Sequence, residues 1–365
     1  MTTSRHDAEE SVKKTHTSRA RRLSLLLLIA LLLSLLAGCS DFPYPSNSAV
    51  LTQGHGLPDL RLLDWGFFAF QRPIWSPDGR WIAVLAGEDF AGAHVEVVSP
   101  DGKTRYDLSS WGCGEGPDPE YAWLPDSRLS CINDDKPYSK LCIDAAPFTS
   151  CAATRLDQDI NGSQPGIAWT PDGRSALYTA WPNDGSDSYE SLYVLAPDGS
   201  ARQILTFPGY YGVVAPSFRP HQTELAYFRG ASADLKLGTV YYDLVIGSYT
   251  EAADGKLTLG AARMITSDAF PESSSYAWSP SGRWLAMRID DYHGNDDTRD
   301  RIALINADNP GQIVDVVQTY QMGDQWMMDP VWSPDGKTLI VLGGTGPQPY
   351  SIDIAGFLAS KGLQP

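Results

Sequence analysis

Short apolar runs, interrupted by one recurring polar turn, organise most of the chain. In an early copy, Trp75 precedes the turn Ser76-Pro-Asp-Gly-Arg80, and the apolar run Trp81-Ile-Ala-Val-Leu85 follows it. Proline at the first corner, then aspartate, and glycine where the backbone needs positive φ, are typical of a tight turn. The apolar runs are too short for ordinary helices. Each copy therefore predicts two strands joined by a tight turn.

The aromatic residue before the turn recurs at nearly even spacing. It stands at Trp75, Trp123, Trp169, Phe218, Trp278 and Trp332, in steps of 48, 46, 49, 60 and 54 residues. Repeats of this length with paired strands are typical of propeller blades, because one blade cannot bury both of its faces alone. We therefore expect an all-β, six-bladed β-propeller, with the aromatic anchors filling the space between blades.

These copies resemble the WD40-like repeat of TolB-type propellers, in which P-x-W-S-P-D-G-x-x-I-A precedes a second strand pair. The second half is visible in Val95-Glu-Val-Val-Ser-Pro-Asp-Gly102 and in Leu192-Tyr-Val-Leu-Ala-Pro-Asp-Gly199. The resemblance covers roughly residues 58–356 and departs most at Phe218-Arg-Pro-His221. It implies four-stranded antiparallel blades around a central channel. It implies no single function, because such propellers include docking platforms, gates and enzymes.

The two ends of the repeat array predict how the ring closes. Leu60-Arg-Leu-Leu-Asp64 matches the outermost-strand pattern of Arg202-Gln-Ile-Leu-Thr206 but has no blade before it. The last blade, after Tyr350-Ser-Ile-Asp-Ile354, lacks such a strand. We therefore expect residues 58–64 to complete the sixth blade and remove an exposed edge.

The N-terminal residues 1–38 have the pattern of a signal peptide. Arginines precede an apolar run of 14 residues, Leu23–Leu36, which is short for a bilayer span. Leu36-Ala-Gly-Cys39 resembles a bacterial lipobox, which implies an acylated Cys39 and attachment to a membrane. We expect a lipoprotein of the cell envelope, anchored on the extracytoplasmic side, with residues 39–57 as a flexible tether and 58–365 as the propeller. An ordinary signal peptide is the alternative.

Four cysteines remain after such processing: Cys113, Cys131, Cys142 and Cys151. Export permits disulfides, and an even number favours them. Three pairings are possible, and we prefer Cys142–Cys151 together with Cys113–Cys131. Zinc binding is the alternative, but the chain has no C-x-x-C and no nearby histidine.

Acidic residues outnumber basic ones by 44 to 28, a formal charge of −16. Removing residues 1–38, with six basic and three acidic groups, leaves 22 against 41, or −19. This balance argues against nucleic-acid binding. Much of it is equally consistent with a solvated surface that aids solubility.

Acidic hairpin loops and aromatic interblade links should share one rim of a propeller. That rim suits a basic peptide or protein through charge and cation–π contacts, or a sugar through stacking. The candidate binding-face residues are Asp134, Asp135, Asp184, Asp187, Asp290, Asp291, Asp296, Asp297, Trp65, Trp111, Tyr210, Tyr211 and Trp326. Solvation of loops and packing at blade edges is the alternative interpretation.

The loop Asp290-Asp-Tyr-His-Gly-Asn-Asp-Asp297 raises two further possibilities. Its oxygens could bind calcium, although the spacing is not that of an EF-hand. Acid pairs such as Asp290 and Asp291 could also serve a glycosidase or a metal-dependent lyase acting on polysaccharide. No hydrolase, zinc-protease or phosphate-loop motif is present, so we assign no catalytic residue and no cofactor. The sequence favours a membrane-anchored, non-catalytic binding or scaffolding module.

Overall fold

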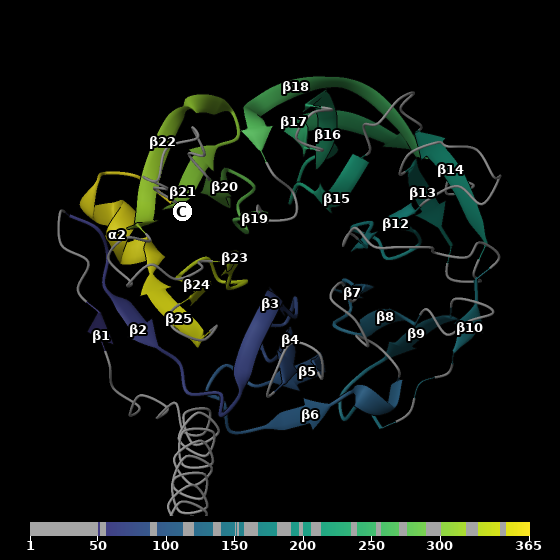
Figure 1. Ribbon diagram of the computed structural model, residues 1–365, viewed down its shortest axis with the longest axis horizontal. Helices are drawn as coiled ribbons and strands as arrows, with labels where there is room; N and C mark the ends of the chain where they lie inside the picture. Colours follow the sequence, from purple (N-terminus) through teal and green to yellow (C-terminus); the bar gives the residue numbers. More distant parts are fainter. Residues whose placement is uncertain are drawn as a thin grey trace, which may run out of the picture. The chain divides into compact units, whose positions relative to one another are not determined.

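Six antiparallel sheets follow one another around a ring (Figure 1). The computed structural model describes residues 50–51, 56–87, 93–111, 120–133, 140–149, 151, 153–156, 167–180, 191–196, 200–205, 213–234, 239–252, 257–269, 276–289, 301–318, 328–343 and 348–365. The predicted signal peptide, residues 1–38, and Cys39 lie outside them. None of the helices among these residues has the length and apolar character needed to cross a membrane.

The first three blades follow in chain order. Blade 1 consists of β3 (Phe68–Trp75), β4 (Ile82–Gly87), β5 (His94–Val98) and β6 (Arg105–Asp107), followed by a 3-10 turn, η2 (Ser109–Trp111). Blade 2 consists of β7 (Glu120–Trp123), β8 (Leu129–Asn133), β9 (Lys140–Asp144) and β10 (Thr154–Arg155). Blade 3 consists of β11 (Ala168–Trp169), β12 (Ala176–Ala180), β13 (Ser191–Leu195) and β14 (Ala201–Leu205).

The remaining blades differ in length and in how they end. Blade 4 consists of β15 (Val213–Phe218), β16 (Glu224–Asp234), β17 (Thr239–Glu251) and β18 (Leu257–Ala269). Blade 5 consists of β19 (Tyr276–Trp278), β20 (Trp284–Ile289), β21 (Arg301–Asn306) and β22 (Asn309–Gln318). Blade 6 combines β23 (Met328–Trp332), β24 (Thr338–Gly343) and β25 (Gln348–Asp353) with β2 (Leu60–Leu62) and β1 (Val50–Leu51). The predicted six-bladed architecture is confirmed.

The N-terminal strand β2 closes the ring as the sequence predicts. It pairs antiparallel with β25, with Arg61 opposite Ser351 and Leu62 opposite Tyr350. The N–H of Leu63 then donates to the Pro349 carbonyl over 2.8 Å. Strand β1 adds a fifth strand beside β2. Because β1 lies within residues 39–57, part of the segment expected to be a tether belongs to the blade.

A short C-terminal helix, α2 (Ile354–Ser360), packs at the junction of blades 5 and 6. Asp353 caps it by accepting a hydrogen bond from the Gly356 N–H over 2.9 Å. Ile354, Phe357 and Leu358 are buried in the same cluster as Leu60 and Leu62. The helix and the closing strand are therefore stabilised by one shared core.

Among the described residues, the hydrophobic core is divided into six clusters, one at each junction between neighbouring blades. Each cluster contains one of the six aromatic anchors. The Trp123 indole N–H donates to the Ile74 carbonyl of blade 1 over 2.9 Å, and that of Trp169 donates to the Ser130 hydroxyl of blade 2 over 2.7 Å. The anchors therefore fill the space between blades, as expected, and Trp123 and Trp169 add directed hydrogen bonds to the preceding blade.

The repeated turn is held by its own polar side chains. In blade 1 the Ser76 hydroxyl donates to Asp78 over 2.7 Å and accepts from the Trp81 N–H over 3.0 Å. Gly79 has φ +72 and donates its N–H to the Ser76 carbonyl. The same Ser–Asp bond joins Ser333 to Asp335 in blade 6. These aspartates act as turn formers, which is the role that the sequence predicts.

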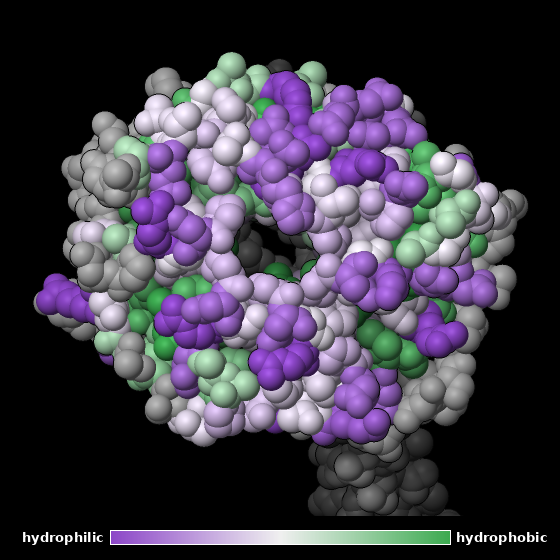
Figure 2. All heavy atoms as spheres, turned by 180° about the vertical axis from the view of Figure 1, so that it is seen from behind, coloured by the Kyte–Doolittle hydropathy of each residue, from purple (hydrophilic) through white to green (hydrophobic). Residues whose placement is uncertain are grey.

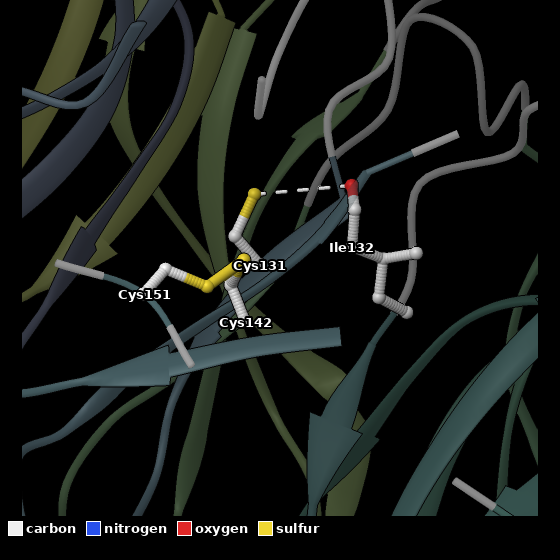
Figure 3. The surroundings of a disulfide bond; sticks show 4 residues. All are labelled: Cys131, Ile132, Cys142 and Cys151. Carbon is white, nitrogen blue, oxygen red and sulfur yellow. Dashed lines mark hydrogen bonds between the residues drawn. A yellow bond between two sulfur atoms is a disulfide. The ribbon is translucent and has the colours of Figure 1, made fainter. Parts of the chain in front are cut away.

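Blade 2 carries the disulfide Cys142–Cys151, with Cα atoms 5.4 Å apart (Figure 3). This pairing is confirmed. Cys131 lies directly opposite Cys142 in the β8–β9 ladder and is also disulfide-bonded. Its expected partner, Cys113, lies outside the described residues, so the Cys113–Cys131 pairing stays a prediction.

Candidate functional site

Two residues of the expected binding face belong to the core. Trp65 is 4% exposed and packs at the junction of blades 6 and 1, while Trp111 is 6% exposed and packs at the junction of blades 1 and 2. Placing these two residues on a binding face was wrong. Both indoles fill apolar space at a blade junction and are not presented to a ligand.

The other eleven candidates fall outside the described residues. They are Asp134, Asp135, Asp184, Asp187, Asp290, Asp291, Asp296, Asp297, Tyr210, Tyr211 and Trp326. The expected calcium loop is among them. The acidic rim therefore stays a prediction.

A cluster of ionisable side chains that the sequence analysis did not select lies on the outer half of blade 1. It contains His94 and Glu96 of β5 and Arg105 and Asp107 of β6, and we call it the His94 cluster. Nε2 of His94 lies 3.1 Å from Oε1 of Glu96 and 3.3 Å from Oδ1 of Asp107. Nε of Arg105 donates to Oε2 of Glu96 over 2.7 Å, and its NH2 group also contacts Oε1.

Burial sets the electrostatics of the His94 cluster. The Glu96 side chain is fully buried, whereas that of Asp107 is 56% exposed. A buried carboxylate requires charged or hydrogen-bonding partners, which Arg105 and His94 supply. Burial acts to raise the pKa of Asp107, but hydrogen bonds from Ser109 and the nearby His94 and Arg105 outweigh it and lower that pKa.

Strand alternation places the His94 cluster beside the junction of blades 6 and 1, which we call the closing junction. Val95 and Val97 of β5 pack toward blade 2, whereas Val98 packs into the cluster shared with blade 6. Glu96 has the same strand phase as Val98 and therefore faces the closing junction. The Arg105 guanidinium lies over the Phe67 ring, 4.6 Å from its centroid, in the link that follows the closing strand.

A second surface lies on the outer edges of blades 4 and 5, at the periphery of the ring (Figure 1). Its strands β18 and β22 have 13 and 10 residues, whereas the outermost strands of blades 1, 2 and 3 have three, two and five. Among the described residues, the exposed large hydrophobic side chains are Met264 of β18, at 57%, and Ile313 of β22, at 47%. We call β18 and β22 with these two side chains the outer-edge surface.

Strand β18 offers an extended backbone with few bulky groups around its exposed positions. Thr258, Gly260, Ala261 and Ala262 are exposed along it, and its flanking strand β17 pairs with it on one side. Natural edge strands are usually short or charged, because a long apolar edge is a template for another strand. β18 has the features of a surface to which a partner strand can add.

The central channel opens in the middle of the ring. In the view from the opposite side, the surface is hollowed at this point and hydrophilic residues predominate around it (Figure 2). The described residues provide one close group of at least three histidine, cysteine or carboxylate ligands, and it is the His94 cluster on blade 1. Among those residues, no such group lies on the channel.

Comparisons with solved structures agree with the fold. A protein named as a candidate gluconolactonase matches with a TM-score of 0.52 and 14% identity, over 82% of this chain and 93% of its own. An oligogalacturonate lyase from Vibrio parahaemolyticus matches with a TM-score of 0.47 and 12% identity, over 84% of this chain and 97% of its own. The propeller domain of a Myceliophteria thermophila protein matches with a TM-score of 0.43 and 14% identity, over 78% of this chain and 82% of its own.

No family model matches the chain. At these identities the similarity concerns the propeller fold, and the fold hosts both enzymes and binding modules. The function must therefore be argued from the residues of this chain.

Neither the His94 cluster nor the outer-edge surface has a local motif. For the His94 cluster, the sequence shows only His94-x-Glu96 at alternate positions of a strand. This pattern indicates a site only when the strand register, which pairs Glu96 with Asp107, is known. The signal for the outer-edge surface is the spacing of 60 residues between Phe218 and Trp278, which reflects the longer outer strands of blade 4.

Proposed function

We propose that this protein is a membrane-anchored, extracytoplasmic propeller that binds a partner protein without catalysing a reaction. The lipobox-like Leu36-Ala-Gly-Cys39 supports the anchor. The single observation that carries the binding role is the outer-edge surface, where two adjacent blades expose long strands with Met264 and Ile313.

The partner contributes an extended segment with apolar and basic side chains. An exposed edge strand offers backbone N–H and C=O groups, which favours addition of a strand rather than of a helix. Met264 and Ile313 provide apolar contact area beside that edge. The formal charge of −19 that remains without residues 1–38 attracts a basic segment at long range and raises the association rate.

Copurification from native membranes tests this proposal. In Met264→Lys/Ile313→Lys, edge lysines oppose strand addition and repel a basic partner. A second variant changes Asp290, Asp291, Asp296 and Asp297 to Asn. We expect a near-stoichiometric partner to be lost from the lysine variant and retained by the asparagine variant. Loss only from the asparagine variant would place docking on the acidic rim and overturn the outer-edge assignment.

Two further results bear on the proposal as a whole. Cys39→Ser should release the chain from the membrane fraction, since it removes the sulfur that acylation requires. Retention of this variant in the membrane would contradict the lipid anchor. Absence of any partner from the wild-type protein, together with turnover of a polysaccharide, would replace the binding role by catalysis.

A further inference from the structure

The His94 cluster places an imidazole nitrogen against two carboxylates. Nε2 of His94 lies within 3.3 Å of both Oε1 of Glu96 and Oδ1 of Asp107. Nε2 therefore points between the two carboxylates, in the position from which an imidazole lone pair and two carboxylate oxygens can converge on one metal ion. The three ligand atoms lie within 4.8 Å of one another.

The spacing of these atoms fits a small transition-metal ion. Zinc binds imidazole nitrogen and carboxylate oxygen at about 2.0–2.2 Å, and two such bonds at a tetrahedral angle separate the ligand atoms by roughly 3.4 Å. The separations of 3.1 and 3.3 Å require only small rearrangements to reach that value. A hard ion such as calcium prefers six to eight oxygen ligands, which this cluster does not provide.

Charge also favours a cation. Two carboxylates and one guanidinium leave a formal charge of −1 when His94 is neutral, at a place where Glu96 is fully buried. Metal ligands usually receive orienting hydrogen bonds from a neighbouring shell of side chains. Nε of Arg105 donates to Oε2 of Glu96 over 2.7 Å and its NH2 group contacts Oε1, so Arg105 can orient that carboxylate through Oε2, and binding of Oε1 to a metal requires the NH2 contact to lengthen.

We propose that His94, Glu96 and Asp107 form a binding site for a divalent transition-metal ion of the zinc class. Three protein ligands leave one coordination position for water. Because β5 and β6 both supply ligands, and Arg105 packs on Phe67, metal binding stabilises the outer half of blade 1 beside the closing junction. This proposal does not depend on the proposed partner binding.

Calorimetric titration with zinc chloride tests the site. The full chain in detergent, without a polyhistidine tag and after EDTA treatment, is compared with His94→Gln and Asp107→Asn. Asp101→Asn is the matched control, since Asp101 is an exposed aspartate in the hairpin between the same two strands and lies outside the His94 cluster. We expect one zinc equivalent to be lost in the two cluster variants and kept in the control, with no heat from calcium at this site.

X-ray absorption at the zinc edge provides an answer that does not depend on whether a variant folds. The wild-type protein at one zinc equivalent should show a single imidazole with oxygen ligands and no sulfur. No zinc binding, equal zinc binding by all four proteins, or a spectrum with several imidazoles or with sulfur would overturn the proposal.

Discussion

Arg219 of blade 4 donates to both carboxylate oxygens of Asp308 in blade 5, each over 2.9 Å. The same guanidinium donates through Nε to the Gly282 carbonyl over 2.7 Å and through NH1 to Glu224 over 2.5 Å. Arg219 stands where the other repeats have a serine, threonine or leucine. In the fourth repeat, whose turn departs most from the repeated pattern, a buried arginine therefore joins two blades.

Arg219→Ala should lower the free energy of unfolding by about 3 kcal/mol, because it removes the donor to the Gly282 carbonyl and the ion pairs of Arg219 with Glu224 and Asp308, although Arg263 still donates to Glu224. Urea unfolding measures this change. Arg80→Ala is the control, since Arg80 is 71% exposed and pairs with Asp78 at the surface, where such pairs contribute under about 1 kcal/mol. Equal losses in the two variants would show that the Arg219 contacts do not stabilise the junction.

Gly102 packs directly against the link that follows the closing strand. A Cβ there would collide with the Asp64 carbonyl oxygen and lie 3.5 Å from the Trp65 Cα, and φ is +73. Gly66 has the same φ but nothing within 4 Å of such a Cβ. Gly66→Ala should lower the free energy of unfolding by about 1 kcal/mol, from backbone strain alone. Gly102→Ala should lower it clearly more, because the added Cβ also collides with the Asp64 carbonyl oxygen. Thermal melts of both variants decide this, and identical Tm values would contradict the close approach.

Removing the confirmed disulfide should destabilise the protein. The double variant Cys142→Ser/Cys151→Ser avoids leaving one thiol beside the disulfide-bonded Cys131 opposite Cys142. With the two cysteines nine positions apart in the sequence, loop-closure entropy predicts a loss of about 2–3 kcal/mol. Chemical unfolding without reductant measures the difference. An unchanged unfolding midpoint would mean that the bond contributes nothing to stability.

Acid should weaken the turns that aspartates hold. Hydrogen bonds from Ser99 and Lys103 lower the pKa of Asp101 to about 2, and a hydrogen bond from Ser333 lowers that of Asp335. A folded-state pKa below the ordinary value of about 4 stabilises the protein above that pH, and this contribution is lost as the pH falls toward 2.

Melts of wild type and Asp101→Asn/Asp335→Asn between pH 5 and pH 2 test this dependence. Asparagine keeps an acceptor oxygen but does not titrate in this range. We expect Tm to fall less steeply in the variant than in the wild type. Parallel curves would assign the acid sensitivity to other groups.

The repeat period predicted much more of the fold than of the site. Anchors such as Trp123 and Trp332 mark each blade, because the burial they require is local to a junction between two repeats. The match of Leu60-Arg-Leu-Leu-Asp64 to outermost strands predicted the closing pair with Tyr350. Arg219 and the His94 cluster could not be read in advance, since their partners are set by cross-strand register and by contacts between blades. The sequence pattern did not reveal that Trp65 is buried, because a residue in a link between blades can either face solvent or fill a junction.

Site-specific photo-crosslinking in native membranes tests the central claim most directly. A photoreactive amino acid replaces Met264 on β18 or, as the control, Lys103, which is 81% exposed in the hairpin of blade 1. We predict one dominant protein adduct from position 264 and none from position 103. No adduct at position 264, or the same adducts from both positions, would contradict a partner bound at the outer-edge surface.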